Sequence, residues 1–290
     1  ASYNANLGMR VYGNTHGINA GYPSSRYSLS CMVIGAQDND MQRDYAYTVS
    51  RKASLLQSAS AVGIDAAKAT VDRLGARKIN TANVPVLLHR DIASSLFGHY
   101  VGAISGGSLY RRSSFLLDSL GKQVFPEWLN IEERPFIKGG LASSSFDNEG
   151  VACSDMTIVD AGKLATYLYT TYSSRKLNTR SNGHAGGIHN WLVGDTGHSD
   201  ADLLKEMGTG LFVTELMGQG VNGVTGDYSR GAAGYWVENG IIQYPVHEVT
   251  IAGNLKDMFK GIVAIGAEKD VRGSVQTGSV LIDQMKIAGS

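Results

Sequence analysis

Apolar and polar residues alternate in short runs over the first fifty positions. The runs cover residues 9–12, 27–34 and 45–49, and glycine, asparagine, proline and serine separate them. A two-residue period places successive side chains on opposite faces, which is typical of half-buried strands. This part of the chain therefore predicts antiparallel sheet.

Helical spacing replaces this alternation in four places. The clearest helix covers residues 64–74, and Gly75 follows at the position where a positive φ angle ends many helices. We expect three more helices, each beginning at a side chain that can cap it. They run from Asp91 to about residue 101, from Ser199 to residue 207 and from Asn254 to residue 262.

Short apolar runs indicate the remaining strands. Two of them flank Asn239-Gly240 between residues 232 and 246, and Asn-Gly favours the type I′ turn of a hairpin. A second hairpin is predicted over residues 156–169, with Gly162 in its turn. Further strands are predicted at 84–88, 275–282 and 285–288. The predicted fold class is α+β, mainly antiparallel sheet with a few helices packed on it.

Composition limits the class of protein. With 290 residues, 43% of them hydrophobic, the chain is long enough to bury a full core. Its 26 basic and 26 acidic residues cancel, and no basic stripe of the kind that binds nucleic acid is visible. Residues 92–110 lack charged side chains, but their four glycines and four serines predict a buried helix and a tight loop. We therefore expect neither nucleic acid nor a membrane as a partner.

Glycine and cysteine carry further information. Glycine occupies 36 positions, and fourteen of these lie between residues 181 and 240. Such a density suits tight turns, and it also suits the approach of an extended ligand to the backbone. Cys31 and Cys153 stand far apart outside any Cys-x-x-Cys motif, so we expect no disulfide and no cysteine zinc site. We predict small buried thiols and a cytoplasmic location.

Three functional motifs are only partly present. Residues 218–223 read GQGVNG after an apolar run, but no helical period follows, as a dinucleotide site would require. Residues 89–91 read His-Arg-Asp, without the asparagine and the DFG of a kinase. Ser105 stands in an alanine-for-glycine version of Gly-x-Ser-x-Gly, after residues that predict a helix. Two interpretations of Ser105 therefore stay open, namely a catalytic nucleophile and an ordinary serine in a loop.

The histidines offer one candidate metal site. A zincin needs His-Glu-x-x-His on a helix, whereas the His-Glu pair at 247–248 lies in a predicted strand without a second histidine. His184 and His189 are five residues apart in a glycine-rich segment, with Asp195 and His198 nearby. One interpretation is a metal site. The other is loop histidines bonded to the backbone, since no carboxylate sits at ligand spacing beside either one.

Seven longer runs carry a family resemblance. They are LFGHYVGAISGG at 96–107, FLLDSLGK at 115–122, SNGHAGGIHNW at 181–191, TELMGQG at 214–220, TGDYSRGAAG at 225–234, WVENG at 236–240 and IAGNLKDM at 251–258. In these runs the chain resembles the TldD/PmbA family, the so-called modulators of DNA gyrase, and in particular its PmbA branch, also called TldE. The resemblance implies that residues 1–290 are the central and C-terminal region, and that the family's N-terminal domain is missing from this chain.

The resemblance also implies an activity and a partner. In this family a PmbA-like subunit pairs with a TldD-like subunit to form a cytoplasmic metalloprotease that cleaves unfolded peptides, such as antitoxin or microcin precursor segments. Zinc is expected in the TldD-like partner, on a helical His-Glu-x-x-x-His and a later cysteine. The matching helix here, at residues 98–103, has one histidine and no glutamate, and residues 270–278 contain no cysteine. We therefore expect no cofactor, metal ligand or catalytic residue in this chain.

The leading hypothesis is a non-catalytic half of a heterodimeric peptidase that offers a sheet edge and glycine-rich walls to an extended peptide. A homodimer in the absence of the partner stays open. Two alternatives also stay open, namely an autonomous hydrolase with an unrecognised site and a protein-binding modulator of DNA gyrase. The candidate residues for contact with substrate or partner are His99, His184, His189, Tyr228 and Arg230.

Overall fold

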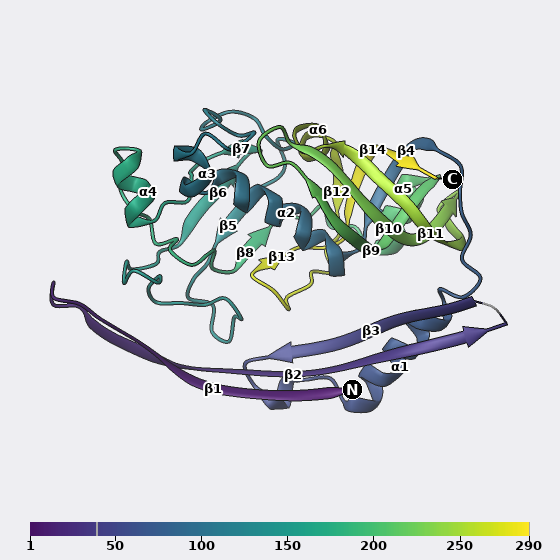
Figure 1. Cartoon of the computed structure of the whole chain (residues 1–290), viewed down its shortest axis with the longest axis horizontal. Coiled ribbons are helices and arrows are strands. Elements are labelled where there is room, and N and C mark those ends of the chain that lie inside the picture. Colours follow the sequence, from purple (N-terminus) through teal and green to yellow (C-terminus); the bar gives the residue numbers. More distant parts are fainter. Residues whose placement is uncertain (39, 290) are drawn as a thin grey trace.

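The first fifty residues form a three-stranded antiparallel sheet, as the alternation predicts. The computed structural model describes residues 1–38 and 40–289. Figure 1 shows this sheet as a long, arched lower layer beneath the rest of the molecule. Its strands, hydrogen-bonded in chain order, are β1 (Ser2–Gly13), β2 (Asn19–Gln37) and β3 (Asp40–Ser50).

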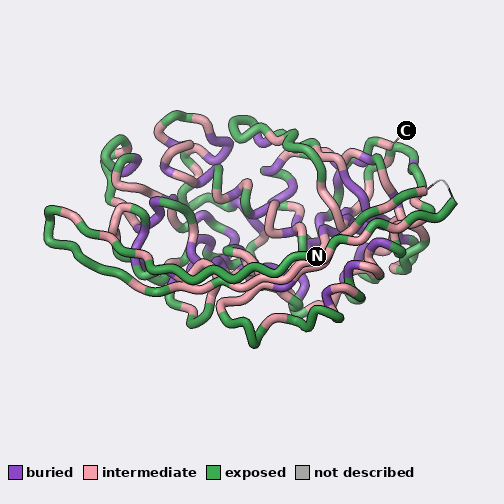
Figure 2. The backbone as a smooth tube through the Cα atoms, turned by 60° about the horizontal axis from the view of Figure 1, so that its bottom comes forward, coloured by how far each residue is buried: buried purple, intermediate pink, exposed green. Residues whose placement is uncertain are grey.

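One helix, α1 (Ala59–Val71), covers one end of this sheet after a 3₁₀ turn at Ala53–Leu55. Ser58 caps α1, which therefore begins five residues before the predicted start at residue 64. The helix packs closely because Gly35 of β2 lacks a side chain: a Cβ there would lie 3.1 Å from the methyl group of Thr70. Figure 2 shows that β1 stays largely exposed. Its exposed apolar side chains are Tyr3, Leu7, Met9 and Val11.

Six strands of the upper layer form a sheet that closes on itself. The order is β11-β10-β9-β4-β14-β12, and β11 also pairs with β14, so five of these strands complete a ring. β4 runs parallel to β9, and the other neighbours are antiparallel. The strands are β4 (Ala82–Leu88), β9 (Gly210–Val221), β10 (Asp227–Glu238), β11 (Ile241–Asn254), β12 (Ile262–Ile265) and β14 (Val280–Ala288).

A second sheet of five short strands belongs to the same layer. Its order is β13 (Val275–Gln276), β8 (Trp191–Val193), β5 (Ile131–Glu133), β6 (Met156–Asp160) and β7 (Lys163–Leu164). The helix α2 (Arg90–Ile104) joins the two sheets through Tyr100, which is fully buried. The Tyr100 ring lies 6.0 Å from the ring of Trp191 on β8 and 5.7 Å from that of Phe259 on α6 (Leu255–Lys260).

The remaining helices are short, and their ends follow local sequence signals. They are α3 (Gly106–Tyr110), α4 (Thr171–Lys176) and α5 (Asp200–Met207). Ser199 caps α5 in a reciprocal capping box with Asp202, and Asn254 caps α6, as predicted. The predicted type I′ hairpin is also confirmed, because Asn239 and Gly240 have φ angles of 53° and 75°.

The predicted start and end of α2 are wrong. Its cap is His89, whose Nδ1 accepts a hydrogen bond from the backbone N–H of Asp91, so Asp91 lies in the first turn. Gly102 lies inside α2 and residues 106–107 lie in α3, where a tight loop is predicted. A new helix begins directly after α2 because the hydroxyl of Ser105, which lies between the two helices, caps α3.

The fold class is α+β, as predicted, with helices packed on mixed and antiparallel sheets. The second predicted hairpin is shorter than expected, because its return strand is only the two residues of β7. The last strands divide differently, at β13 and β14. Within the described residues, no helix combines the length and the apolar character needed to cross a membrane.

Candidate functional site

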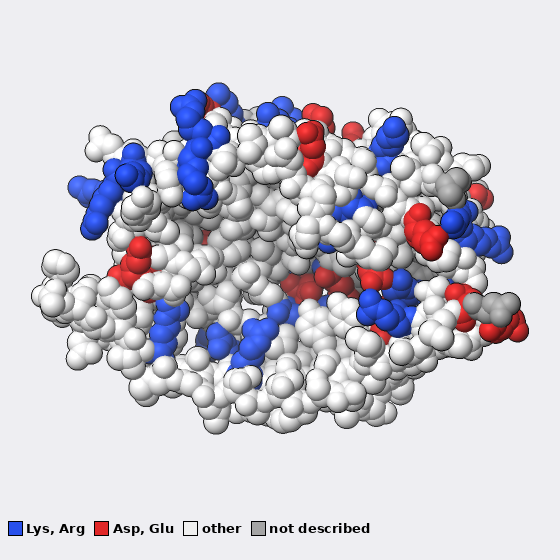
Figure 3. Space-filling view, viewed as in Figure 1, with Lys and Arg blue, Asp and Glu red and all other residues white. Residues whose placement is uncertain are grey.

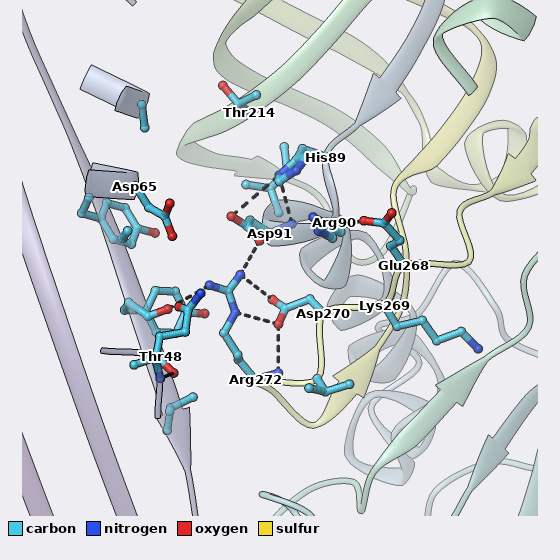
Figure 4. Close-up of a pocket in the computed structure, with 18 of the residues that line it drawn as sticks. Thr48, Asp65, His89, Arg90, Asp91, Thr214, Glu268, Lys269, Asp270 and Arg272 are labelled. Carbon is cyan, nitrogen blue, oxygen red and sulfur yellow. Dashed lines mark hydrogen bonds and ion pairs between the residues drawn. The ribbon is translucent and has the colours of Figure 1, made fainter. Parts of the chain in front are cut away.

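A cleft separates the lower sheet from the upper layer, and Figure 3 shows it as a hollow across the middle of the molecule. One pocket in this cleft has a volume of about 630 Å³. Residues 44–49 of β3 line one side, and the start of α2 and residues 268–272 line the other. Figure 4 shows charged side chains from these segments gathered in the pocket. A large pocket that gathers titratable groups is the candidate functional site.

The free edge of β3 faces this pocket. Among the described strands, β3 pairs only with β2. The carbonyl of Tyr47 accepts a hydrogen bond from Arg272 (3.1 Å), so the backbone groups of Tyr47 point away from β2. Successive residues of a strand alternate in this respect, so Tyr45 and Val49 point the same way. The Tyr45 N–H indeed donates to the Asp44 carboxylate at 2.7 Å.

Arg272 ties the two sides of the cleft together. Its guanidinium bonds to Asp270 from Nε (2.8 Å), contacts Asp91 at the start of α2, and stacks over the Tyr47 ring at 4.3 Å from the centroid. Burial opposes the charge, but the hydrogen bond to Asp270 and the nearby carboxylates outweigh burial and raise the pKa of Arg272. The cation is therefore permanent, and it links β3 to the upper layer.

His89 lines the same pocket as a neutral imidazole. Burial lowers its pKa and outweighs the opposing charge of Asp91. Its Nδ1 accepts the backbone N–H of Asp91 (3.4 Å), which requires that this nitrogen carry no proton. Its ring lies edge-on to Phe212, with 5.7 Å between centroids. The pocket thus combines a neutral histidine with the permanent cation of Arg272.

Three of the predicted contact residues, His99, Tyr228 and Arg230, come together beside a smaller pocket of about 290 Å³, which His99 lines. The His99 and Tyr228 rings meet edge-on at 5.8 Å, and Arg230 donates from Nε to the carbonyl of Gly218 (3.0 Å). Burial, with a smaller effect of the Arg230 charge, lowers the pKa of His99. The Nε2 atom of His99 is buried, and no atom of the described residues bonds to it.

The other two predicted residues, His184 and His189, lie in the interior, each less than a tenth exposed. His184 Nε2 is 3.0 Å from a carboxylate oxygen of Glu133. His189 Nε2 is 3.1 Å from the carbonyl of Gly183 and 3.3 Å from Cys153 Sγ. His189 thus fits the interpretation of a histidine bonded to the backbone. His184 instead lies beside a carboxylate that comes from a strand distant in sequence. Their contact with a substrate or partner stays a prediction.

The nucleophile and metal alternatives find no suitable geometry. Across residues 1–38 and 40–289, no group of three or more His, Cys, Asp or Glu side chains could hold a metal ion. The Ser105 hydroxyl donates to the carbonyl of Gly102 (2.9 Å) and caps α3. Burial raises the pKa of the Cys153 thiol to about 11, so the thiol is protonated at neutral pH. Cys31 is only half-buried, contrary to the prediction.

Sequence reasoning missed the residues of the cleft. Tyr47 and Arg272 meet although 225 positions separate them, and Asp91 comes from a third segment. One signal was available, since the titratable residues at 89–91 directly follow the buried end of strand β4. Side chains at such a strand-to-helix junction often face a binding crevice.

The chain matches two domains of one protein family. Residues 1–74 match the PmbA/TldA metallopeptidase central domain, and residues 81–289 match the C-terminal domain. The metalloprotease PmbA of Escherichia coli O157:H7 is 57% identical over 288 residues, which are 99% of this chain and 64% of the relative. The metalloprotease PmbA homolog of Haemophilus influenzae is 56% identical over 292 residues, which are 100% of this chain and 64% of the relative. The chain thus spans 64% of the length of these relatives.

Solved structures share the fold. A putative modulator of a DNA gyrase from Thermotoga maritima has a TM-score of 0.91 at 30% identity, over 99% of this chain and 68% of that chain. TldE from Thermococcus kodakarensis has a TM-score of 0.88 over the same shares, and at 19% identity it shows the fold alone. Because the two matched domains cover both layers, and the identity to the E. coli relative extends over nearly the whole chain, this chain belongs to the PmbA/TldD metallopeptidase family.

Proposed function

We propose that this chain is part of the non-catalytic subunit of a two-subunit cytoplasmic peptidase, and that it binds an unfolded peptide as an added strand along β3. The edge of β3 that no described strand covers carries the proposal, because Tyr45, Tyr47 and Val49 on this edge line the cleft pocket. An added strand would replace Arg272 at the Tyr47 carbonyl and Asp44 at the Tyr45 N–H. An extended chain can bond to such an edge through its own backbone. Recognition of this kind depends little on sequence, which suits the processing of unfolded segments.

Glycines of the upper layer support the same proposal. A second hollow of about 510 Å³ lies between α2 and residues 186–188 and 273–275. Gly98 and Gly187 line it, and a Cβ added at either would meet no atom within 4 Å. A main chain can therefore approach the backbone closely at these two glycines. The net charge of zero imposes no overall preference for acidic or basic peptides.

The metal that the family name implies does not fit the described residues around α2. His99 is the one histidine on α2, and the pocket beside it is lined by hydroxyl, amide and apolar groups such as Ser108, Ser113 and Gln219. Structural and catalytic zinc sites use thiolate, imidazole and carboxylate ligands instead. In this proposal the zinc and the hydrolytic step belong to a TldD-like partner.

Reconstitution tests the subunit role. The whole protein, a TldD-like subunit with zinc, and their mixture are each incubated with an unfolded peptide, and cleavage is followed by mass spectrometry. We expect cleavage in the mixture that neither subunit shows alone. Full-rate cleavage by the TldD-like subunit alone would remove the proposed role, and cleavage by this protein alone would favour the autonomous hydrolase.

A backbone-modified peptide tests the binding mode. Two peptides of identical sequence are compared for binding to the whole protein, one of them methylated on alternate amide nitrogens. Methylation removes the donors that an added strand needs and leaves the side chains unchanged. We expect methylation to weaken binding at least tenfold. Equal affinity for the two peptides would show that β3 does not bind a strand.

A further inference from the structure

A basic and aromatic surface lies at the other end of α2 from the cleft pocket. Since α2 has 15 residues, its ends are about 22 Å apart. The surface is formed by α3, α4 and the residues that follow them, and Figure 3 shows Lys and Arg side chains gathered on this end of the molecule. We call it the α3–α4 patch. Its members are the cations Arg111, Arg112, Arg175, Lys176 and Arg180, which are all exposed, and the tyrosines Tyr110 and Tyr172.

Aromatic contacts join the two helices into one continuous surface. The Arg111 guanidinium lies 5.2 Å from the centre of the Tyr110 ring and donates to its hydroxyl (3.1 Å). Tyr110 meets Tyr172 edge-on, with 5.6 Å between centroids. The Lys176 ammonium lies 5.6 Å from the centre of the Tyr172 ring. Two cations are thus held in place at the two ends of a tyrosine pair.

The charge of this patch is not neutralised within the part of the chain that the structure describes. None of its five cations forms an ion pair there, although the chain as a whole carries no net charge. Elsewhere, arginines such as Arg73, Arg90 and Arg134 each contact two carboxylates. Arg175 and Lys176 lie in the last turn of α4, where the helix dipole favours cations, but this does not account for the other three.

The arrangement favours carboxylates over nucleic acid. Single strands of nucleic acid bind by stacking bases on free aromatic faces, whereas Tyr110 is half-buried and both tyrosines already have a cation beside the ring. Guanidinium forks and tyrosine hydroxyls are well suited to bind carboxylates. We propose that the α3–α4 patch binds an acidic peptide segment. This goes beyond the proposed function, because it concerns side chains of the bound segment and a surface outside the cleft.

Fluorescence anisotropy with the whole protein tests the patch. The probes are a labelled 12-residue peptide of alternating glutamate and serine, the same peptide with glutamine for glutamate, and a labelled single-stranded oligonucleotide. We expect the glutamate peptide alone to bind, with an affinity that falls as salt rises. Equal binding of the glutamine peptide would overturn the proposal. Tighter binding of the oligonucleotide would overturn it in favour of nucleic acid.

Charge-matched variants locate the binding. The double variant Arg111→Gln with Lys176→Gln should weaken binding of the glutamate peptide about tenfold, as expected for two exposed ion pairs. The control Lys68→Gln with Lys138→Gln removes two exposed, unpaired cations elsewhere, and it should change affinity less than twofold. If the patch variant and the control variant lose the same affinity, binding depends on overall charge and not on the patch. Arg111→Lys with Lys176→Arg keeps the charge and should retain most of the binding, so misfolding cannot mimic the result.

Discussion

Replacement of His184 by leucine should destabilise the fold strongly, because the change removes a polar partner from a buried carboxyl group. Glu133 is 1% exposed. One of its oxygens accepts the backbone N–H of His189 (3.0 Å) and the indole N–H of Trp191 (2.7 Å), and the other lies 3.0 Å from His184 Nε2. Leucine is close to histidine in size, so the variant loses a polar contact and keeps most of its packing contacts.

The size of the effect follows from the burial of both groups. Leaving a buried acceptor unsatisfied costs about 1–3 kcal/mol. We therefore expect His184→Leu to lower the free energy of unfolding by about 2 kcal/mol. With an unfolding entropy of about 2.1 cal/mol/K per residue, a chain of 290 residues loses about 3 °C in Tm.

Urea denaturation, followed by tryptophan fluorescence, measures this change, since Trp191 lies beside the site. His16→Leu is the control, because His16 is exposed, and it should change stability by less than about 0.5 kcal/mol. The double variant His184→Leu with Glu133→Leu should cost less than the sum of the single variants. A cost below 1 kcal/mol for His184→Leu, or strict additivity in the double variant, would refute the reasoning.

Three further predictions concern the cleft, the ring and the small pocket. Arg272→Gln should speed hydrogen exchange at residues 44–49 about tenfold, because β3 loses its bond to the upper layer. Gly234→Ala should cost about 2–3 kcal/mol in urea denaturation, since its Cβ would lie 1.9 Å from the carbonyl oxygen of Phe212. In an NMR titration His99 should take up its proton below pH 6.5, because burial lowers its pKa. As pH falls below 6.5, His99 is protonated in the unfolded chain before it is protonated in the folded chain. The contribution of neutral His99 to stability is therefore complete above pH 6.5 and is lost as pH falls.

Each of these predictions has a specific control. Arg43→Gln, on the same strand as Tyr47, should leave exchange at residues 44–49 unchanged, and equal acceleration in both variants would argue against the link through Arg272. Gly8→Ala should be neutral, because a Cβ there meets no atom within 4 Å. Arg230→Gln should raise the pKa of His99, and an unchanged pKa would argue against a charge effect.

Local signals determined which elements the sequence could predict. The Asn239-Gly240 turn and the Ser199 cap depend on the conformations of adjacent residues, and the structure confirms both. The α2 boundary depends on a competition between two capping side chains two residues apart, and His89 is the cap rather than Asp91. Propensity alone does not decide such a competition.

Non-local contacts explain what the sequence could not predict. The pairing of β11 with β14 and the position of β4 between β9 and β14 depend on segments far apart in the chain. The same holds for Glu133 beside His184, where spacing along the chain gave no sign of a carboxylate. His99 was a predicted contact residue and lines the small pocket, whereas the cleft pocket depends on the packing of the lower sheet against the upper layer.

The closed ring of the upper layer constrains the order in which this protein can fold during synthesis. β14, at residues 280–288, pairs with both β4 and β11, so the ring stays open until this late segment leaves the ribosome. Until then one side of β4 has no partner strand, although Val86, Leu87 and Leu88 of that strand are buried in the complete fold. A nascent chain that stalls before residue 280 would therefore expose the apolar strand β4 with an unpaired edge. Such a chain should depend on chaperones to avoid aggregation.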